Sequence, residues 1–112
     1  MKVITQPLTI EELKKLAANT FVEMIKGVVD IERKILAVDA ELHSDLEAYL
    51  LENGSKQKDL WGINLYPDKS EKDWIEFDSM INVRPSQGNR SRGVESLDIQ
   101  IKVKDTVNDL IL

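Results

Sequence analysis

The sequence predicts an α+β fold: a mostly antiparallel sheet of four to five strands with two or three helices, in the order β-α-β-β-α-β-β-α. Segments with apolar residues three and four positions apart, typical of amphipathic helices, are interspersed with segments in which apolar and polar residues alternate, as in half-buried strands. The strand-like segments follow one another in pairs, which favours antiparallel pairing with the helices on one face. At 112 residues the chain can bury its own core, so we expect residues 1–112 to form a single domain.

The N-terminal quarter predicts a short strand and a helix. Residues 2–5, "KVIT", have the composition of a strand. Thr9 and Glu12 have the spacing of a capping box, in which each side chain satisfies a free backbone N–H at the start of a helix. Apolar residues then recur three and four positions apart, and we expect a helix over residues 10–21.

The next segment predicts a hairpin followed by a second helix. In residues 25–42 two stretches rich in β-branched residues flank Glu32, Arg33 and Lys34, which indicates an antiparallel hairpin with a charged tip. Ser44 and Glu47 repeat the capping-box spacing, and residues 53–54, Asn-Gly, supply a left-handed stop. The second helix is therefore expected over residues 45–53.

The remaining segments predict two strands and a final helix. Residues 60–66 alternate in polarity, and so do residues 74–84, where the polar side of the strand carries Glu76, Asp78, Asn82 and Arg84. Trp61 falls with the apolar residues of its strand and is expected in the core. Trp74 falls with the polar ones, so it either covers a sheet edge or marks an exposed contact patch. Residues 97–111 fit both periods, but only the helical period continues to the end, which favours a helix. This helix either closes the core or packs against a second copy of the chain.

Charge is concentrated in one short window. The net charge is −5, yet Ser79 to Val94 holds Arg84, Arg90 and Arg92 and no acidic residue. The rest of the chain carries 12 Lys and Arg against 20 Asp and Glu, a net charge of −8. This balance argues against the broad basic face that binds nucleic acid.

Composition and the N-terminus exclude further classes of protein. There is no cysteine, which excludes thiolate metal ligands, catalytic thiols and disulfides. Residues 1–13 lack the apolar run of a signal peptide, and no stretch approaches the roughly 20 apolar residues of a membrane span. We therefore expect a soluble cytoplasmic protein with no membrane partner.

Three strings in the chain, "AELHSD", "ENGSKQKDLWGINLYP" and "WIEFDSMINVRPSQGNRS", resemble a family of small uncharacterised prokaryotic proteins, classified as a domain of unknown function. The resemblance spans nearly the whole chain and implies a small, soluble, prokaryotic protein. It implies no reaction, ligand or catalytic residue. The residues that carry it are His43, Asp45, Gly54, Gln57, Trp61, Gly62, Asn64, Glu76, Asp78, Asn82, Arg84, Pro85, Gln87, Gly88, Asn89, Arg90 and Ser91.

The cationic window predicts a loop that can hold an anion. Pro85 ends the preceding strand, and the pair Gly88-Asn89 can adopt the positive φ angles that curl the backbone and direct several N–H groups at one point. Arginine, amide and hydroxyl side chains add further donors for a phosphate or carboxylate. The candidate ligand-binding residues are Arg84, Gln87, Asn89, Arg90 and Ser91, with Asn64 and Asn82 as further candidates. In the alternative reading, the arginines pair with the protein's own acidic residues, such as Glu76 or Asp78.

Acid–base chemistry has three candidate residues. His43 is the only histidine and could act as a general base oriented by a carboxylate. Glu76 and Asp78 share the polar side of their strand and could act as acid or base with an arginine as a clamp. A solvated antiparallel strand has the same pattern. The carboxylates around His43 also offer oxygen ligands, but with one histidine and no cysteine we expect no metal site and no cofactor.

Three functions follow in order of preference. The first is a small binding or interaction module, self-associating, whose cationic loop recognises a small anion. The second is an enzyme that acts on a phosphorylated or carboxylated small substrate, with Glu76, Asp78 or His43 as acid or base. The third, which the charge balance disfavours, is a weak RNA or DNA binder.

Overall fold

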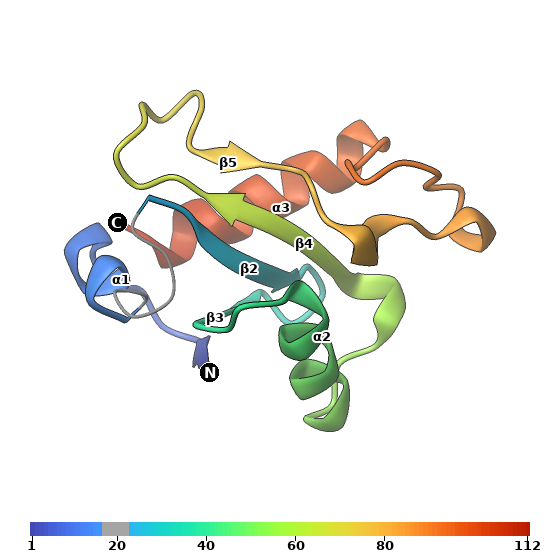
Figure 1. Ribbon diagram of the computed structural model, residues 1–112, viewed down its shortest axis with the longest axis horizontal. Coiled ribbons are helices and arrows are strands. Elements are labelled where there is room, and N and C mark those ends of the chain that lie inside the picture. Colours follow the sequence, from blue (N-terminus) through green and yellow to red (C-terminus); the bar gives the residue numbers. More distant parts are fainter. Residues whose placement is uncertain (17–22) are drawn as a thin grey trace.

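A computed structural model describes residues 1–16 and 23–112 (Figure 1). These residues form an α+β fold with one five-stranded antiparallel sheet in the order β1-β3-β2-β4-β5, which confirms the predicted fold class. The strands are β1 (Lys2–Ile4), β2 (Ile25–Asp30), β3 (Ile35–Val38), β4 (Leu60–Leu65) and β5 (Ile75–Glu76), and the helices are α1 (Ile10–Leu16), α2 (His43–Glu52) and α3 (Leu97–Leu110). There are also three 3₁₀ turns in the described residues. η1 (Gln57–Asp59) comes directly before β4, and η2 (Met80–Asn82) and η3 (Pro85–Gln87) follow β5.

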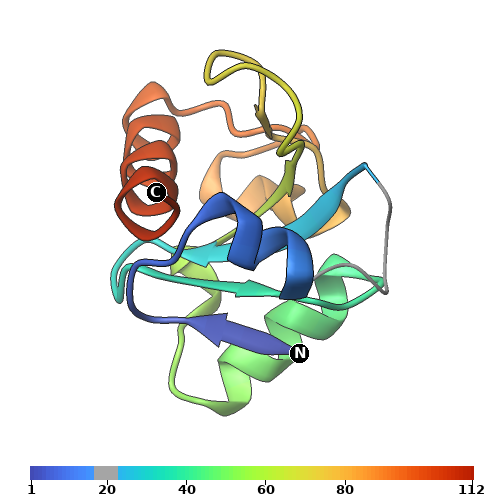
Figure 2. The same cartoon turned by 90° about the vertical axis from the view of Figure 1, so that its left-hand side faces the viewer.

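The helices cover both faces of the sheet, so the prediction that they lie on one face is wrong. Val107 of α3 packs in one apolar cluster with Val29 and Ile63, whereas Leu46 of α2 packs in a second cluster with Val28. Figure 2 shows α2 and α3 on opposite sides of the strands. The physical reason is that every residue of β3 and β4 is buried, and strands with two apolar faces need cover on both.

The first half of the chain follows the predictions in part. The Thr9 hydroxyl and the Glu12 carboxylate form the predicted capping box, each accepting the other's backbone N–H at 3.2 Å. Helix α1 begins at residue 10 as expected and is described as far as Leu16, while residues 17–21 of the predicted helix lie outside the described residues. The predicted hairpin is confirmed as β2 and β3 with residues 31–34 at its tip.

The second predicted capping box does not form. Helix α2 begins at His43 with Leu42 as its N-cap and has no side-chain cap. The helix thus begins two residues earlier than predicted, with the His43 ring hydrogen bonded to the Ile63 carbonyl of β4. Ser44 therefore lies inside the first turn, where its hydroxyl cannot cap.

The predicted strand over residues 74–84 is largely wrong. β5 ends at Glu76, and the rest of the predicted strand contains the 3₁₀ turn η2 and irregular chain. Asn82 and Arg84 are buried and do not lie on a solvated polar face. Trp74 is only 6% exposed and belongs to the core, so the alternative that it marks an exposed contact patch is wrong.

Helix α3 confirms the helical interpretation of residues 97–111 and closes the core. Val103, Val107 and Leu110 are buried against the sheet. Ile111, directly after α3, forms a bridge with Leu8, which lies before α1, and Leu112 N–H donates to the Leu8 carbonyl at 2.9 Å. Within the described residues, no helix combines the length and the apolar character that crossing a membrane requires.

Candidate functional site

Polar residues from three neighbouring strands form a row on the face of the sheet that α2 covers. Lys26 of β2 lies opposite Asn64 of β4, which lies opposite Glu76 of β5. Asn64, in the middle, is only 5% exposed. Its Nδ2 donates to Glu76 Oε1 at 2.9 Å and to the Asp78 carbonyl at 3.2 Å. Asn64 therefore joins the end of β4 to β5 and to the chain that follows β5.

Tyr66 extends this row beyond the end of β4. Its hydroxyl donates to the same Glu76 oxygen that Asn64 contacts, at 3.0 Å. Burial, followed by the hydrogen bond and charge of Glu76, raises the pKa of Tyr66. Tyr66 was not among the candidates from the sequence, although its position two residues after Asn64 places both side chains on one side of a strand.

His43, at the start of α2, lies above β4 with its ring oriented by a backbone group. Nε2 is 2.8 Å from the Ile63 carbonyl oxygen, and because a carbonyl only accepts, Nε2 carries the proton. Burial lowers the pKa of His43, and the charge of Lys26 also lowers it, while the Ile63 carbonyl, Asp78 and Asn64 oppose the shift. Burial therefore favours the neutral form of the ring, and in that form the lone pair lies on Nδ1.

Arg92 connects the cationic loop to this row. Its Nε donates to Asp78 Oδ1 at 2.7 Å, and both side chains are about half exposed. The sequence placed Arg92 in the cationic window but not among the ligand-binding candidates. We call His43, Asn64, Tyr66, Glu76, Asp78 and Arg92 together the polar cluster. It brings together all three acid–base candidates and one arginine.

Arg84 does not reach this cluster, because its guanidinium is used inside the chain. The side chain is 8% exposed and donates to the carbonyls of Ile81, Gln57 and Leu60 and to the Gln87 side chain. The guanidinium carbon lies 4.3 Å from the centroid of the Trp61 ring, a cation–π contact. Burial lowers the pKa of Arg84, and the charge of Glu47 opposes this.

The amide side chains of the loop also bind the chain itself. Gln87 Nε2 donates to the Lys58 carbonyl at 3.0 Å. Asn89 Nδ2 donates to the carbonyls of Asn82, Ser91 and Gly93, and its Oδ1 accepts the N–H of Glu95 at 2.8 Å. These contacts fix the course of the loop from inside.

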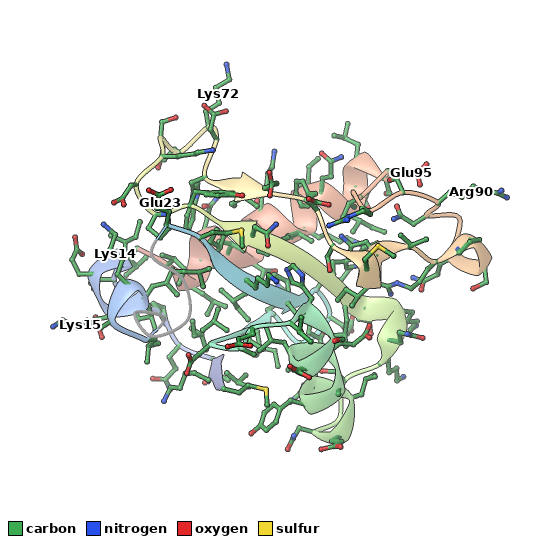
Figure 3. The ribbon with its side chains drawn as sticks, in the orientation of Figure 1. Lys14, Lys15, Glu23, Lys72, Arg90 and Glu95 are labelled. Carbon is green, nitrogen blue, oxygen red and sulfur yellow. The ribbon has the colours of Figure 1, made fainter. Side chains whose placement is uncertain are left out.

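Of the predicted ligand-binding residues, Gln87, Arg90 and Ser91 are exposed, and Arg90 and Ser91 make a shared contact through their backbone. Their backbone N–H groups both donate to one oxygen, Oε2 of Glu95, with a distance of 3.2 Å for Ser91. Both residues are exposed. Figure 3 shows the Arg90 side chain projecting from the end of the loop, with Glu95 beside it.

The carboxylates near His43 in the sequence do not form a metal site with it in the described residues. The ring nitrogen Nε2 is bound to the Ile63 carbonyl. Among residues 1–16 and 23–112, no group of three or more His, Cys, Asp and Glu side chains has a metal-binding arrangement.

The fold and the site define a small α+β protein with a polar cluster at one end of its sheet. The chain belongs to the family described as "Protein of unknown function (DUF5674)", whose model matches residues 2–110. This finding confirms the resemblance to a domain of unknown function. No curated protein and no solved structure matches the chain.

Proposed function

We propose that this protein binds a small molecule at the polar cluster. The observation that supports the proposal is the meeting of His43, Glu76 and Asp78 around Asn64, although these residues come from α2, β5 and the segment after β5. If the polar side of this strand only faced solvent, it would need neither a buried asparagine that orients a carboxylate nor a histidine hydrogen bonded to a carbonyl of β4.

The groups of the cluster specify the chemistry of the ligand. The exposed Glu76 carboxylate and the lone pair on His43 Nδ1 both accept hydrogen bonds, which suits a hydroxyl or amine. The half-exposed Arg92 guanidinium, held by Asp78 through Nε, suits an anionic group. The ligand that fits is a small molecule with a hydroxyl or amine at one end and a carboxylate or phosphate at the other.

Enzymatic activity on such a ligand is the second candidate function, favoured by the fixed tautomer of His43. A neutral imidazole whose other nitrogen is held by a carbonyl can accept a proton from a ligand hydroxyl or amine. Asp78, whose charge favours protonated His43, would then stabilise the imidazolium.

A thermal-shift screen tests binding. The compounds are hydroxycarboxylates, amino acids, sugar phosphates and nucleotides. A true ligand at about 100 times its dissociation constant stabilises the protein by about 2.7 kcal/mol. We expect one compound class to raise the melting temperature of the wild type and of Glu71→Gln, a matched change of an exposed carboxylate outside the cluster. The same class should fail with Glu76→Gln. Equal shifts in both variants, or no shift in the wild type, would contradict the proposal.

Turnover separates the enzyme from the binding protein. We would incubate each binding compound with wild type and with His43→Gln and follow the compound by NMR. Product formed only by the wild type, with binding retained in the variant, would support His43 as a base. Binding without turnover in either protein would leave the binding function alone.

A further inference from the structure

The loop that carries Arg90 and Ser91 is held rigidly by buried side chains. Asn89 is 4% exposed, and its side chain makes four hydrogen bonds to backbone groups within residues 82–95. Arg84 and Asn89 also exchange two backbone hydrogen bonds of 2.7 and 3.1 Å. Gly88, with φ of +80°, makes the turn between them in the left-handed region. A ligand would therefore meet a loop whose shape is already set.

This turn directs two consecutive N–H groups at one point at the surface of the loop. Both Arg90 N–H and Ser91 N–H donate to Glu95 Oε2. Consecutive N–H groups that converge in this way form a concave backbone site for an anionic oxygen. In this structure a carboxylate oxygen of the chain itself, from Glu95, lies at that point.

The electrostatic surroundings also favour an anion at this turn. Arg90 lies next to Ser91 and has an exposed side chain, and residues 79–94 contain no acidic side chain. Arg92, on the other side of Ser91, is paired with Asp78. The Glu95 carboxylate is exposed, so it can rotate away without exposing core residues. The Asn89 contact to Glu95 is made by the Glu95 backbone N–H and is unaffected by that rotation.

We infer that the Arg90–Ser91 turn is a second binding site, which takes a small anion, and that the Glu95 carboxylate is an internal occupant that such an anion displaces. The ligand oxygen, from a carboxylate or a phosphate, takes the place of Glu95 Oε2, and the Arg90 guanidinium supplies the countercharge. Because Glu95 is tethered to the loop, it competes at a high effective concentration and weakens binding of the external anion.

Amide chemical shifts provide the direct test. Inorganic phosphate and acetate are titrated separately at constant ionic strength into ¹⁵N-labelled wild type, Glu95→Gln and the control Glu71→Gln. We expect saturable shifts of the Arg90 and Ser91 amides, with phosphate or acetate binding at least fivefold tighter in Glu95→Gln than in the other two proteins. The anion that binds more tightly shows whether the site prefers a phosphate or a carboxylate oxygen. Equal affinities in all three proteins, or shifts that never saturate, would overturn the inference.

A second set of variants keeps the test independent of folding and of the polar cluster. Glu95→Asp keeps the charge on a shorter side chain, so we expect it to compete less well for the two amides and the anion to bind more tightly than in the wild type. Arg90→Ala in the Glu95→Gln background should weaken binding at least threefold, whereas Lys72→Ala, which removes a positive charge in a different region (Figure 3), should not. Anion binding that survives Arg90→Ala unchanged would contradict the site. Shifts at His43 and Asn64 would instead report binding at the polar cluster.

Discussion

The side chain of Asn82 pairs with the backbone of Gly62 as a neighbouring strand would. Gly62 N–H donates to Asn82 Oδ1 at 2.8 Å, and Asn82 Nδ2 donates to the Gly62 carbonyl at 3.0 Å. The same Nδ2 donates to the Arg92 carbonyl at 2.9 Å. A buried side-chain amide thus satisfies β4 beyond the point where β5 ends, and ties the cationic loop to the sheet.

Asn82→Asp should destabilise the fold strongly. A carboxylate at this position places an oxygen against the carbonyls of Gly62 and Arg92, where only a donor fits, and buries a charge. We expect the free energy of unfolding to fall by about 3 kcal/mol, measured by urea denaturation. The same change at the exposed Asn108 should cost under about 1 kcal/mol. Similar losses for the two variants would contradict the pairing described here.

Gly62 and Gly88 should respond differently to alanine. A Cβ at Gly62 would lie 2.5 Å from Ser79 Cβ, so the segment after β5 must move, and we expect a loss of about 2 kcal/mol or more. A Cβ at Gly88 meets no atom within 4 Å, but φ is +80°, so the expected loss is about 1 kcal/mol from backbone strain alone. Urea denaturation of both variants checks the order, and a larger loss at Gly88 would refute it.

Arg84→Ala should unfold the protein more easily because it removes the guanidinium donor from the carbonyls of Gln57, Leu60 and Ile81. The Gln57 carbonyl keeps the Leu60 N–H. We expect a loss of about 3 kcal/mol, with a smaller loss for Arg84→Lys, since an ammonium cannot reproduce the guanidinium fork. Arg90→Ala, at the surface, should change stability by about 0.5 kcal/mol or less. Wild-type stability of Arg84→Ala would show that Arg84 is free for another role.

His43 should make stability depend on pH in a defined window. Because burial lowers its pKa in the folded state, the unfolded chain binds the proton more tightly, at about pH 6.5. The stability that comes from a neutral His43 is thus fully present above that pH and is lost as pH falls from about 6.5 through the folded pKa. Urea denaturation between pH 5 and 8 should show a steeper loss for wild type than for His43→Gln. Parallel curves would contradict the shift.

The sequence was most informative where periodicity and core packing agree. The hairpin of β2 and β3, the Thr9 and Glu12 capping box and helix α3 were predicted from local patterns because each is determined by neighbours in the sequence. The sequence did not predict that helices cover both faces of the sheet. One face of β4 carries Gly62 and Asn64, a small and a polar residue, which suggested a solvated face. In the structure both are buried by contacts with the segment after β5.

The candidate site was predicted in part for the same reason. His43, Glu76 and Asp78 were identified by side-chain chemistry, and the structure brings them together. The roles of Arg84 and Asn89 depend on carbonyls brought close only by folding, for example that of Leu60 for Arg84. Nothing in an arginine-rich string distinguishes donors directed at a ligand from donors directed at the chain's own backbone. Arg92 was not predicted to join the polar cluster because its partner, Asp78, lies 14 positions away.

The two outermost strands of the sheet, β1 and β5, are only three and two residues long. A long, flat edge strand offers a row of free backbone groups to which another polypeptide can add, and such addition begins many amyloid-like assemblies. Here the apolar strands β2, β3 and β4 lie between two short edge strands. Beyond the end of β5, the Asn82 side chain pairs with the backbone of β4 in place of a longer strand. The protein thereby keeps a strongly apolar sheet while leaving little template for fibril growth.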